Sequence, residues 1–335
     1  MFRVALLGRW HVHAMKPDER YLREFLQIPD CAVTCVWDKD PEVAEKWGAE
    51  HGYPVEYDLE TLLSREDVDG VIVTAEPKAH REILVAAANH KKHIFTEKVL
   101  ALTLEDAYAI KDAVEKNGVK FGISFYRMAE KPMAYAKKLI EDGTIGKPSM
   151  FRCMCNVPVG LVPGAVPDYW FEPEICGGGS MLDLGFNSVY IARYILGEAE
   201  SVVSAFSNSI LQGKAEDCGT SVIKFKNGVI GVIDTAYTAA PISTFELTLY
   251  GTEGTYNVRF GGNDIIELQH FGGEKEILNA ADLPEADVAH VMQAWVDACT
   301  KGTSDKDYGI DAAVDMVKIM VAAYESDKDG KRVYI

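Results

Sequence analysis

The sequence predicts an α/β chain of two domains: a Rossmann-type parallel sheet domain, followed by an α+β domain with an open, mostly antiparallel sheet. Three observations support this. The 335 residues exceed the roughly 150 expected of one domain, strands and helices alternate in the first third, and several strands separated only by turns occupy the second half. We place the first domain at residues 1–123 and the second at 124–335, with the last helix able to pack back on the first domain.

The first domain is predicted from its alternating elements. Phe2–Leu7 and Ala32–Trp37 are apolar strands, and each precedes a helix that opens on proline, at Pro17–Leu26 and Pro41–His51. The alternation continues through Gly70–Thr74, Lys78–Asn89, His93–Thr96, Leu104–Asn117 and Lys120–Ile123. Short, uninterrupted apolar strands between helices indicate a parallel sheet buried on both faces.

The pattern changes beyond Phe125, where an irregular stretch rich in glycine and proline runs from Val157 to Gly179. The expected helices are Ala129–Asp142, Met181–Leu196, Ala286–Thr300 and Gly309–Ser326. The expected strands are Glu200–Ser207, Ser221–Phe225, Val229–Tyr237, Thr244–Tyr250, Gly254–Arg259 and Ile265–His270. Lys226-Asn227-Gly228 and the Gly251–Gly254 segment are typical hairpin turns, which predicts antiparallel pairing.

Charge and composition exclude several classes of partner. The net charge is −17, and the basic residues are scattered, so nucleic acid and anionic membranes are unfavourable partners. No apolar run approaches the roughly 20 residues that span a bilayer. The seven cysteines are an odd number without a C-x-x-C pair, which indicates reduced thiols and a cytoplasmic enzyme. Cys153 and Cys155 have no nearby histidine or cysteine, so we predict no metal site.

The first turn, Gly8-Arg9-Trp10-His11-Val12-His13, keeps one of the glycines expected in a dinucleotide-binding turn. Those glycines provide a tight bend, an approach to the pyrophosphate and close helix packing. Only the bend, at Gly8, is clear, because Trp10 and His13 stand where the other two would be. For His11 and His13 we expect phosphate hydrogen bonding or packing, because an H-x-H metal pair has no third ligand in view.

Asp38 follows the second strand directly. An acid at this point accepts hydrogen bonds from the ribose hydroxyls of NAD and repels a 2′-phosphate. We therefore predict NAD as the cofactor, while the neighbouring Lys39 leaves NADP open.

Three segments carry a resemblance to a known family. Val71–Lys98 contains a strand, a helix start at Pro77-Lys78-Ala79-His80 and the turn Glu97-Lys98-Val99, which is similar to E-K-P with valine for proline. Gly177–Asn187 is similar to a glycine-rich lead into D-x-G-x-H, with Asn187 in place of histidine. Ala322–Val333 is similar to a closing helix and tail. The chain resembles the Gfo/Idh/MocA family of NAD(P)-dependent sugar and cyclitol oxidoreductases along its full length.

The resemblance, together with the turn and Asp38, implies a cofactor site after the strands of the first domain. Its predicted residues are Gly8, Arg9, Trp10, His11, Asp38, Lys39, Thr74, Glu76, His80, Glu97, Lys98 and Arg127. For Arg127, at the domain junction, substrate binding and an ion pair between domains are open alternatives.

The resemblance also implies the catalytic residues Lys98, Asp183 and Asn187. Lys98 would hydrogen-bond the reacting oxygen and favour a developing alkoxide. Asp183 and Asn187 lie four apart, hence on one helix face. Asparagine does not accept and release a proton at neutral pH. The missing histidine could be replaced in three ways: Lys98 acts as the base, Asp183 acts directly, or the role passes to Tyr126, Tyr169 or a local histidine. We favour Lys98 together with Asp183.

We predict substrate contacts from Tyr126, Tyr169, Trp170 and Asn187. Aromatic faces beside the acid Asp168 suit a polyol, and core packing is the equal alternative for the Tyr169-Trp170 pair.

The predicted function is hydride transfer to or from a hydroxyl or keto group of a sugar, sugar derivative or cyclitol. One alternative is cleavage or elimination of a glycoside by transient oxidation with tightly held NAD and no net redox. The other is a non-catalytic NAD-binding protein. The resemblance to the Gfo/Idh/MocA family also implies that the open face of the antiparallel sheet makes contacts between subunits. We therefore expect a homodimer or homotetramer.

Overall fold

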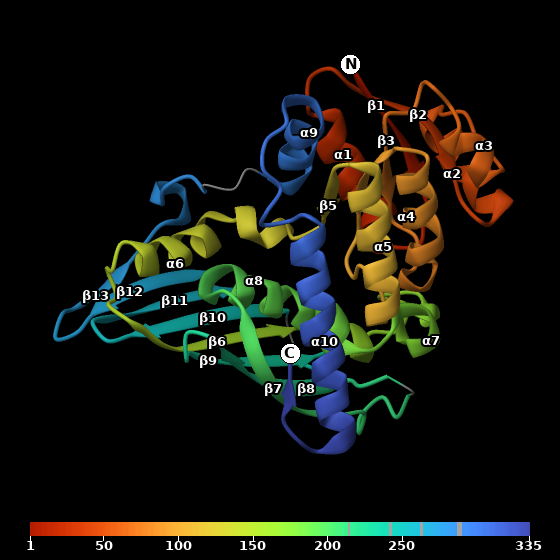
Figure 1. Cartoon of the computed structure of the whole chain (residues 1–335). Helices are drawn as coiled ribbons and strands as arrows, with labels where there is room; N and C mark the ends of the chain where they lie inside the picture. The colour runs from red at the N-terminus through yellow and green to blue at the C-terminus, as the bar shows by residue number, and fades with distance from the viewer. Residues whose placement is uncertain (214, 241–242, 262–263, 287–289) are drawn as a thin grey trace. The chain divides into compact units, whose positions relative to one another are not determined.

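The computed structural model describes residues 1–335 except 214, 241–242, 262–263 and 287–289 (Figure 1). The side chain of Asp168 also lies outside the described part. Contacts divide the chain into unit 1, Met1–Phe125 with Ala289–Val317, and unit 2, Tyr126–Val288 with Lys318–Ile335. The boundary at residue 123 stays a prediction of the sequence.

Unit 1 contains a five-stranded sheet whose paired strands are all parallel. The strands are β1 (Phe2–Leu7), β2 (Cys31–Trp37), β3 (Gly70–Val73), β4 (His93–Thr96) and β5 (Phe121–Ile123), in the order β2-β1-β3-β4-β5. The predicted Rossmann-type parallel sheet is therefore confirmed. The chain order reverses between β1 and β3, and ligands bind such sheets at the carboxyl ends of the strands beside this point.

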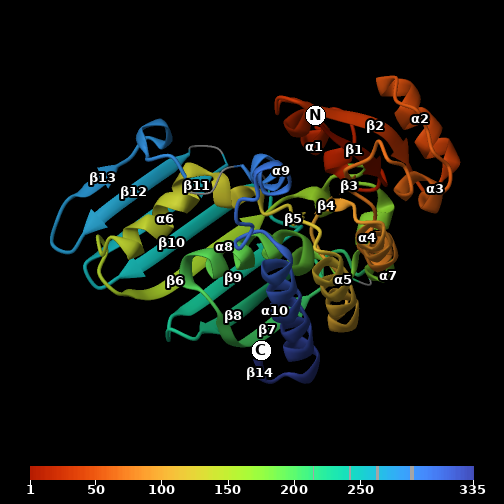
Figure 2. The same ribbon diagram turned by 45° about the horizontal axis from the view of Figure 1, so that its top comes forward.

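Helices cover both faces of this sheet. They are α1 (Arg20–Leu26), α2 (Pro41–His51), α3 (Leu59–Leu63), α4 (His80–Asn89), α5 (Leu104–Asn117) and α9 (Val291–Lys301). Figure 2 shows α1 and α9 on one side and α4 and α5 on the other. Trp295 of α9 is fully buried, with its ring centroid 5.4 Å from that of Phe2 and 5.6 Å from that of Phe95.

Three predicted helix starts in this unit differ from the structure. The helix predicted from Lys78 begins at His80, because Pro77–Ala79 forms a 3₁₀ turn. The helix predicted from Pro17 begins at Arg20, because the chain first forms the 3₁₀ turn η1 (Val12–Ala14) and Glu19 adopts a left-handed backbone with φ 38°. The helix predicted from Ala286 begins at Val291 among the described residues, and positions 287–289 lie outside them.

Unit 2 contains a nine-stranded sheet among its described residues. In spatial order its strands are β13 (Lys275–Ile277), β12 (Ile265–His270), β11 (Gly254–Phe260), β10 (Thr244–Gly251), β6 (Pro148–Asn156), β9 (Ile230–Ala236), β8 (Cys218–Phe225), β7 (Ala199–Ser207) and β14 (Val333–Tyr334). Only the β6–β9 pair is parallel among the pairs described, so the predicted mostly antiparallel sheet is confirmed. Both predicted hairpin turns join antiparallel neighbours.

The helices of unit 2 lie on one face of this sheet, as Figure 1 shows for α6 (Lys131–Glu141) and α8 (Phe186–Leu196). The long α10 (Ile310–Asp329) contributes residues to both units. The short α7 (Pro173–Cys176) was not predicted. The predicted regular helix from Met181 is wrong in its first turn, because Met181–Gly185 is π-helical and α8 follows it. No helix in the described part of the chain is long and apolar enough to span a membrane.

Candidate cofactor and catalytic site

Gly8 and Thr74 directly follow β1 and β3, at the reversal of strand order. Gly8 has a φ of 75°, and a Cβ added to it would lie 2.6 Å from Cα of Ala75. Only glycine fits this bend, because both the positive φ and the close approach exclude a side chain. The sequence therefore keeps a glycine here even though the rest of the turn is irregular.

The turn after Gly8 is held by backbone hydrogen bonds to neighbouring strands. The N–H groups of Trp10 and His11 both donate to the carbonyl oxygen of Thr74, at 3.2 and 3.1 Å. The Thr74 hydroxyl donates in turn to the carbonyl of Gly8. Two N–H groups of the predicted phosphate-binding turn are thus occupied by the protein itself.

Asp38 follows β2 and supports the same turn. Its Oδ2 accepts a hydrogen bond from the Arg9 N–H at 2.7 Å, and its Oδ1 accepts one from the Asp40 N–H at 2.9 Å. A carboxylate offers about four acceptor positions, so two remain for hydroxyl groups. The Lys39 ammonium forms an ion pair with Glu76.

The Arg9 side chain belongs to a separate cluster. Its guanidinium lies 2.5 Å from Oε2 of Glu50 and 3.8 Å from Oε1 of Glu19, and packs 5.7 Å from the ring centroid of Trp47. The backbone N–H and the guanidinium of Arg9 thus both have protein partners, and its predicted cofactor contact stays a prediction.

Glu97 and Lys98 follow β4 at the same edge of the sheet, and the Glu97 N–H donates to the carbonyl of Val73 at 2.9 Å. Lys98 is only 9% exposed, so it is not an ordinary surface lysine. The Lys98–Val99 peptide bond is cis. A buried ammonium at the carboxyl edge of a parallel sheet stands where this class of sheet binds ligands.

His80 opens α4, as expected, but its ring is committed to the backbone. Nδ1 lies 2.8 Å from the Val99 carbonyl oxygen and Nε2 lies 3.1 Å from that of Ala75. Burial lowers the pKa of His80, although the surrounding carbonyls raise it. The imidazole ties the Glu97–Val99 turn to the end of β3, and its predicted cofactor contact stays a prediction.

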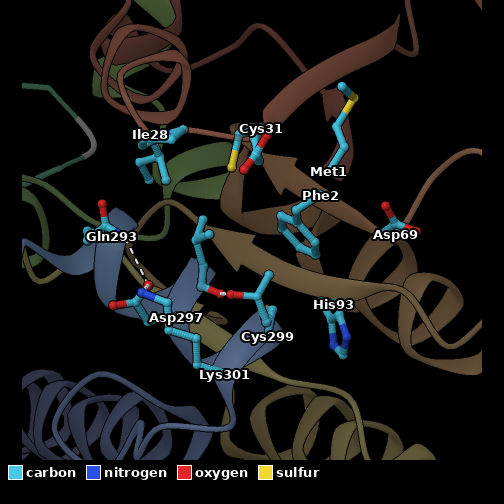
Figure 3. A pocket seen from close by; sticks show the side chains of 14 residues that line it. Met1, Phe2, Ile28, Cys31, Asp69, His93, Gln293, Asp297, Cys299 and Lys301 are labelled. Carbon is cyan, nitrogen blue, oxygen red and sulfur yellow. Dashed lines mark hydrogen bonds and ion pairs between the residues drawn. The ribbon is translucent and has the colours of Figure 1, made fainter.

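A pocket of about 660 Å³ lies at the opposite edge of the unit 1 sheet. Figure 3 shows Phe2, Cys31 and His93 around it, and these residues open β1, β2 and β4. The pocket therefore lies at the amino ends of the strands, away from Gly8 and Lys98.

In unit 2, Asp183 lies in the π-helical turn before α8. Its Oδ2 accepts hydrogen bonds from the Tyr237 hydroxyl at 2.9 Å and from Trp170 Nε1 at 3.3 Å. Asn187 is 6% exposed and donates through Nδ2 to the Asp183 carbonyl at 3.3 Å, while its Oδ1 accepts no hydrogen bond from any described residue. The structure thus brings Asp183, Trp170 and Asn187 together, and it adds Tyr237.

The glycine run before Asp183 is explained by close packing. A Cβ on Gly178 would lie 2.1 Å from the Tyr324 hydroxyl, and one on Gly179 would lie 2.0 Å from the Glu216 carbonyl oxygen. The Glu216 carboxylate accepts hydrogen bonds from the Gly179 and Met181 N–H groups, each at 2.9 Å, and from the Tyr324 hydroxyl at 2.6 Å. Glu216 therefore holds the start of the helix that carries Asp183.

Tyr126 and Arg127 lie in the 3₁₀ turn Tyr126–Ala129. The Arg127 guanidinium lies 4.3 Å from the Phe245 ring centroid and 3.2 Å from Oε1 of Glu130, so it pairs within its own unit. Tyr169 lies in the 3₁₀ turn Asp168–Phe171 with Trp170, which is buried, so the tryptophan face is not open for stacking.

Comparison with known proteins identifies both parts of the chain. Residues 3–125 match the family model described as oxidoreductase family, NAD-binding Rossmann fold, and residues 133–257 match the GFO/IDH/MocA C-terminal domain. The chain belongs to the Gfo/Idh/MocA family. The predicted family is confirmed.

Within this family, two curated relatives illustrate the degree of similarity. Myo-inositol 2-dehydrogenase of Thermotoga maritima is 32% identical over 222 residues, 65% of this chain and 63% of the relative. Levoglucosan dehydrogenase of Pseudarthrobacter phenanthrenivorans is 28% identical over 253 residues, 68% of this chain and 64% of the relative. Each match spans less than two thirds of the relative's own length.

The solved structure of levoglucosan dehydrogenase in complex with NADH and L-sorbose has a TM-score of 0.85 with this chain. The two are 22% identical, and the match covers 100% of this chain and 98% of the other. This likeness confirms the family fold over the full chain.

Proposed function

We propose that this Gfo/Idh/MocA member is an NAD(P)-dependent oxidoreductase that transfers a hydride to or from a hydroxyl or keto group of a sugar, sugar derivative or cyclitol. The observation that carries the proposal is the buried Lys98 ammonium at the carboxyl edge of the Rossmann sheet. The dehydrogenase activities named for the two relatives agree with it. When bound, the nicotinamide supplies the hydride acceptor or donor.

Lys98 is proposed to hydrogen-bond the reacting oxygen. Its positive charge favours the alkoxide that develops when the hydroxyl loses its proton, and burial strengthens this interaction. Asp183 is proposed to bind substrate hydroxyls through its carboxylate, which Tyr237 and Trp170 hold in place by donating hydrogen bonds to Oδ2. Asn187 offers its amide oxygen, a buried acceptor that a substrate hydroxyl would satisfy.

NAD is the proposed cofactor. Asp38 retains acceptor positions for ribose hydroxyls, and Glu76 adds a second carboxylate that neutralises Lys39, the cation that would otherwise favour a 2′-phosphate.

The test of the function is turnover with NAD⁺ over a panel that includes myo-inositol and levoglucosan, followed as NADH formation. Lys98→Ala should lower kcat/KM by roughly 100- to 1000-fold, far more than it lowers NAD affinity. Lys120→Ala, a lysine just before β5, is the matched control. Equal rates for wild type and Lys98→Ala would remove Lys98 from the mechanism. Product without net NADH would instead support elimination, and NAD binding without turnover on the whole panel would support a non-catalytic role.

The assembly is proposed to be a homodimer or homotetramer through the open face of the unit 2 sheet. Two cross-strand pairs on that face, Val203 with Val222 and Met150 with Tyr250, are exposed and apolar. Light scattering on the purified protein would contradict this with a monomer mass. No disulfide joins the seven cysteines, all of which the structure describes, and this supports a reducing, cytoplasmic location as part of the proposal.

A further inference from the structure

Two histidines of the irregular first turn and the carboxylate that follows β4 form one compact cluster. His11 Nε2 lies 3.6 Å from Glu97 Oε1, and His13 Nδ1 lies 3.7 Å from Glu97 Oε2. His11 and Glu97 are buried, and the His13 side chain is 16% exposed. The sequence offered only the H-x-H pair, and the fold supplies the third group from a strand end that is distant along the chain.

The Glu97 carboxylate lacks the hydrogen bonds that burial normally requires. Glu97 is 1% exposed, and neither of its oxygens accepts a hydrogen bond from any residue that the structure describes. Both imidazole contacts exceed hydrogen-bond length. Buried carboxylates are paired, hydrogen-bonded or bound to metal, so a cation between the two histidines and Glu97 would satisfy this one.

The spacing of the three groups fits a metal ion better than direct contact. Zinc lies about 2.0–2.2 Å from imidazole nitrogen and carboxylate oxygen, so ligand atoms at a tetrahedral ion are separated by roughly 3.3–3.6 Å. The distances from the two imidazoles, each to a different oxygen of Glu97, are close to this range, and the three ligand atoms all lie within 4.8 Å of one another. We propose that His11, His13 and Glu97 bind a divalent transition metal ion such as zinc, with the fourth position open to water.

Metal binding would rearrange the hydrogen bonds of both histidine rings. The other ring nitrogen of His13, Nε2, lies 3.7 Å from Oδ2 of Asp18, so this carboxylate orients the ring only if metal binding draws the two into hydrogen-bond range. His13 Nδ1 lies 3.2 Å from the Tyr21 hydroxyl, a hydrogen bond that coordination would replace. His11 Nδ1 accepts a long hydrogen bond of 3.2 Å from the His13 N–H. Coordination through Nε2 moves the ring proton to Nδ1 and exchanges this contact for a metal bond.

A second cluster with ligand-type groups shows the contrast. Glu19, Glu50 and His51 also lie close together, but the Arg9 guanidinium sits between the two carboxylates, and His51 Nε2 lies 2.7 Å from Glu19 Oε1. These acids already have a cation, so this cluster needs no metal ion.

The experiment is zinc binding to tag-free protein that has been stripped with a chelator, measured by calorimetry, with cobalt absorption as a report on coordination geometry. The wild type should bind about one equivalent, and His13→Gln should lose at least 100-fold in affinity. Asp18→Asn should lose roughly 10- to 100-fold, because it leaves all three ligands in place and only loosens His13. His51→Gln is the control and should bind as the wild type does.

Circular dichroism establishes that each variant is folded, and Asp18→Asn, on the partly exposed side of His13, keeps the test informative if the others do not fold. Wild-type protein that binds no zinc, or His13→Gln that binds it as tightly as wild type, would overturn the proposal. The readout is metal binding, so the result is independent of whether the oxidoreductase activity is found.

Discussion

Tyr237 donates a hydrogen bond to Oδ2 of Asp183 across 2.9 Å, from the residue after β9 to the π-helical turn before α8. The tyrosine is fully buried, and burial together with the neighbouring Asp183 raises its pKa well above the usual range, so it remains a donor at physiological pH. This bond fixes one oxygen of the carboxylate that we propose binds substrate.

Tyr237→Phe should therefore impair activity beyond its effect on stability. A hydrogen bond to a charged group contributes about 1.5–3 kcal/mol, so kcat/KM should fall roughly 10-fold or more. Tyr256→Phe is the matched control, because its equally buried hydroxyl donates to the Pro132 carbonyl at 3.1 Å. Steady-state kinetics and urea unfolding of both variants separate the two effects. Equal losses of activity in both would show that Tyr237 acts only through stability.

Gly8→Ala should destabilise the protein and weaken dinucleotide binding. The new Cβ would lie 2.6 Å from Ala75, so the turn would have to shift. The positive φ adds a separate cost of about 1–2 kcal/mol for a residue with a side chain. Gly52→Ala controls for the backbone cost alone, because Gly52 has a φ of 73° and open space around its Cβ position. We expect the Gly8 variant to lose more unfolding free energy than the control and also to lose NAD affinity. Similar losses in the two variants would contradict a packing role for Gly8.

Much of the fold could be predicted because the unit 1 strands are short apolar runs that alternate with helices along the chain. Strand β6 was missed because Pro148–Asn156 carries Arg152, Ser149 and Asn156 and has no β-branched residue. Strands β13 and β14 were missed because three and two residues give no periodicity. Pairing with a long neighbour, rather than intrinsic propensity, makes these segments strands.

The site was predicted where residues belong to local motifs and missed where partners come from distant segments. Lys98 and Asp183 lie in recognisable turns. Tyr237, by contrast, is 54 residues along the chain from Asp183, to which it donates a hydrogen bond. Glu216 is 37 residues from Gly179, whose N–H donates to its carboxylate. The alternating pattern of β9 predicts which face of the strand is buried. It does not predict that the hydroxyl of Tyr237 donates to the carboxylate of Asp183. The same holds for Glu97, whose approach to His11 and His13 depends on the parallel pairing of the strands.

Cofactor preference should respond to the Lys39–Glu76 ion pair. Glu76→Gln removes a carboxylate and releases the Lys39 ammonium, which is then available to a 2′-phosphate. The ratio of NADP to NAD affinity should rise roughly 10-fold, which corresponds to about 1.4 kcal/mol. Calorimetric titration of both cofactors measures it, and Glu60→Gln, at the surface beside His90, is the control. An unchanged ratio of the two affinities would show that the ion pair with Glu76 does not keep the Lys39 ammonium from binding a 2′-phosphate.

Stability should fall in mild acid because of His80. Burial lowers its folded-state pKa below the ordinary 6.5, so below pH 6.5 the unfolded chain binds a proton that the folded protein does not. The stabilisation is complete above pH 6.5 and is lost as the pH falls toward the folded-state pKa, at up to about 1.4 kcal/mol per pH unit. Urea unfolding between pH 7 and pH 5 gives the free energy of unfolding as a function of pH. His80→Gln should reduce the slope of this dependence by the equivalent of nearly one proton. His90→Gln, at a more exposed histidine, controls for the loss of a histidine. A slope that is the same in wild type and His80→Gln would mean that the ring is protonated in the folded protein, with its carbonyl partners offsetting the cost of burial.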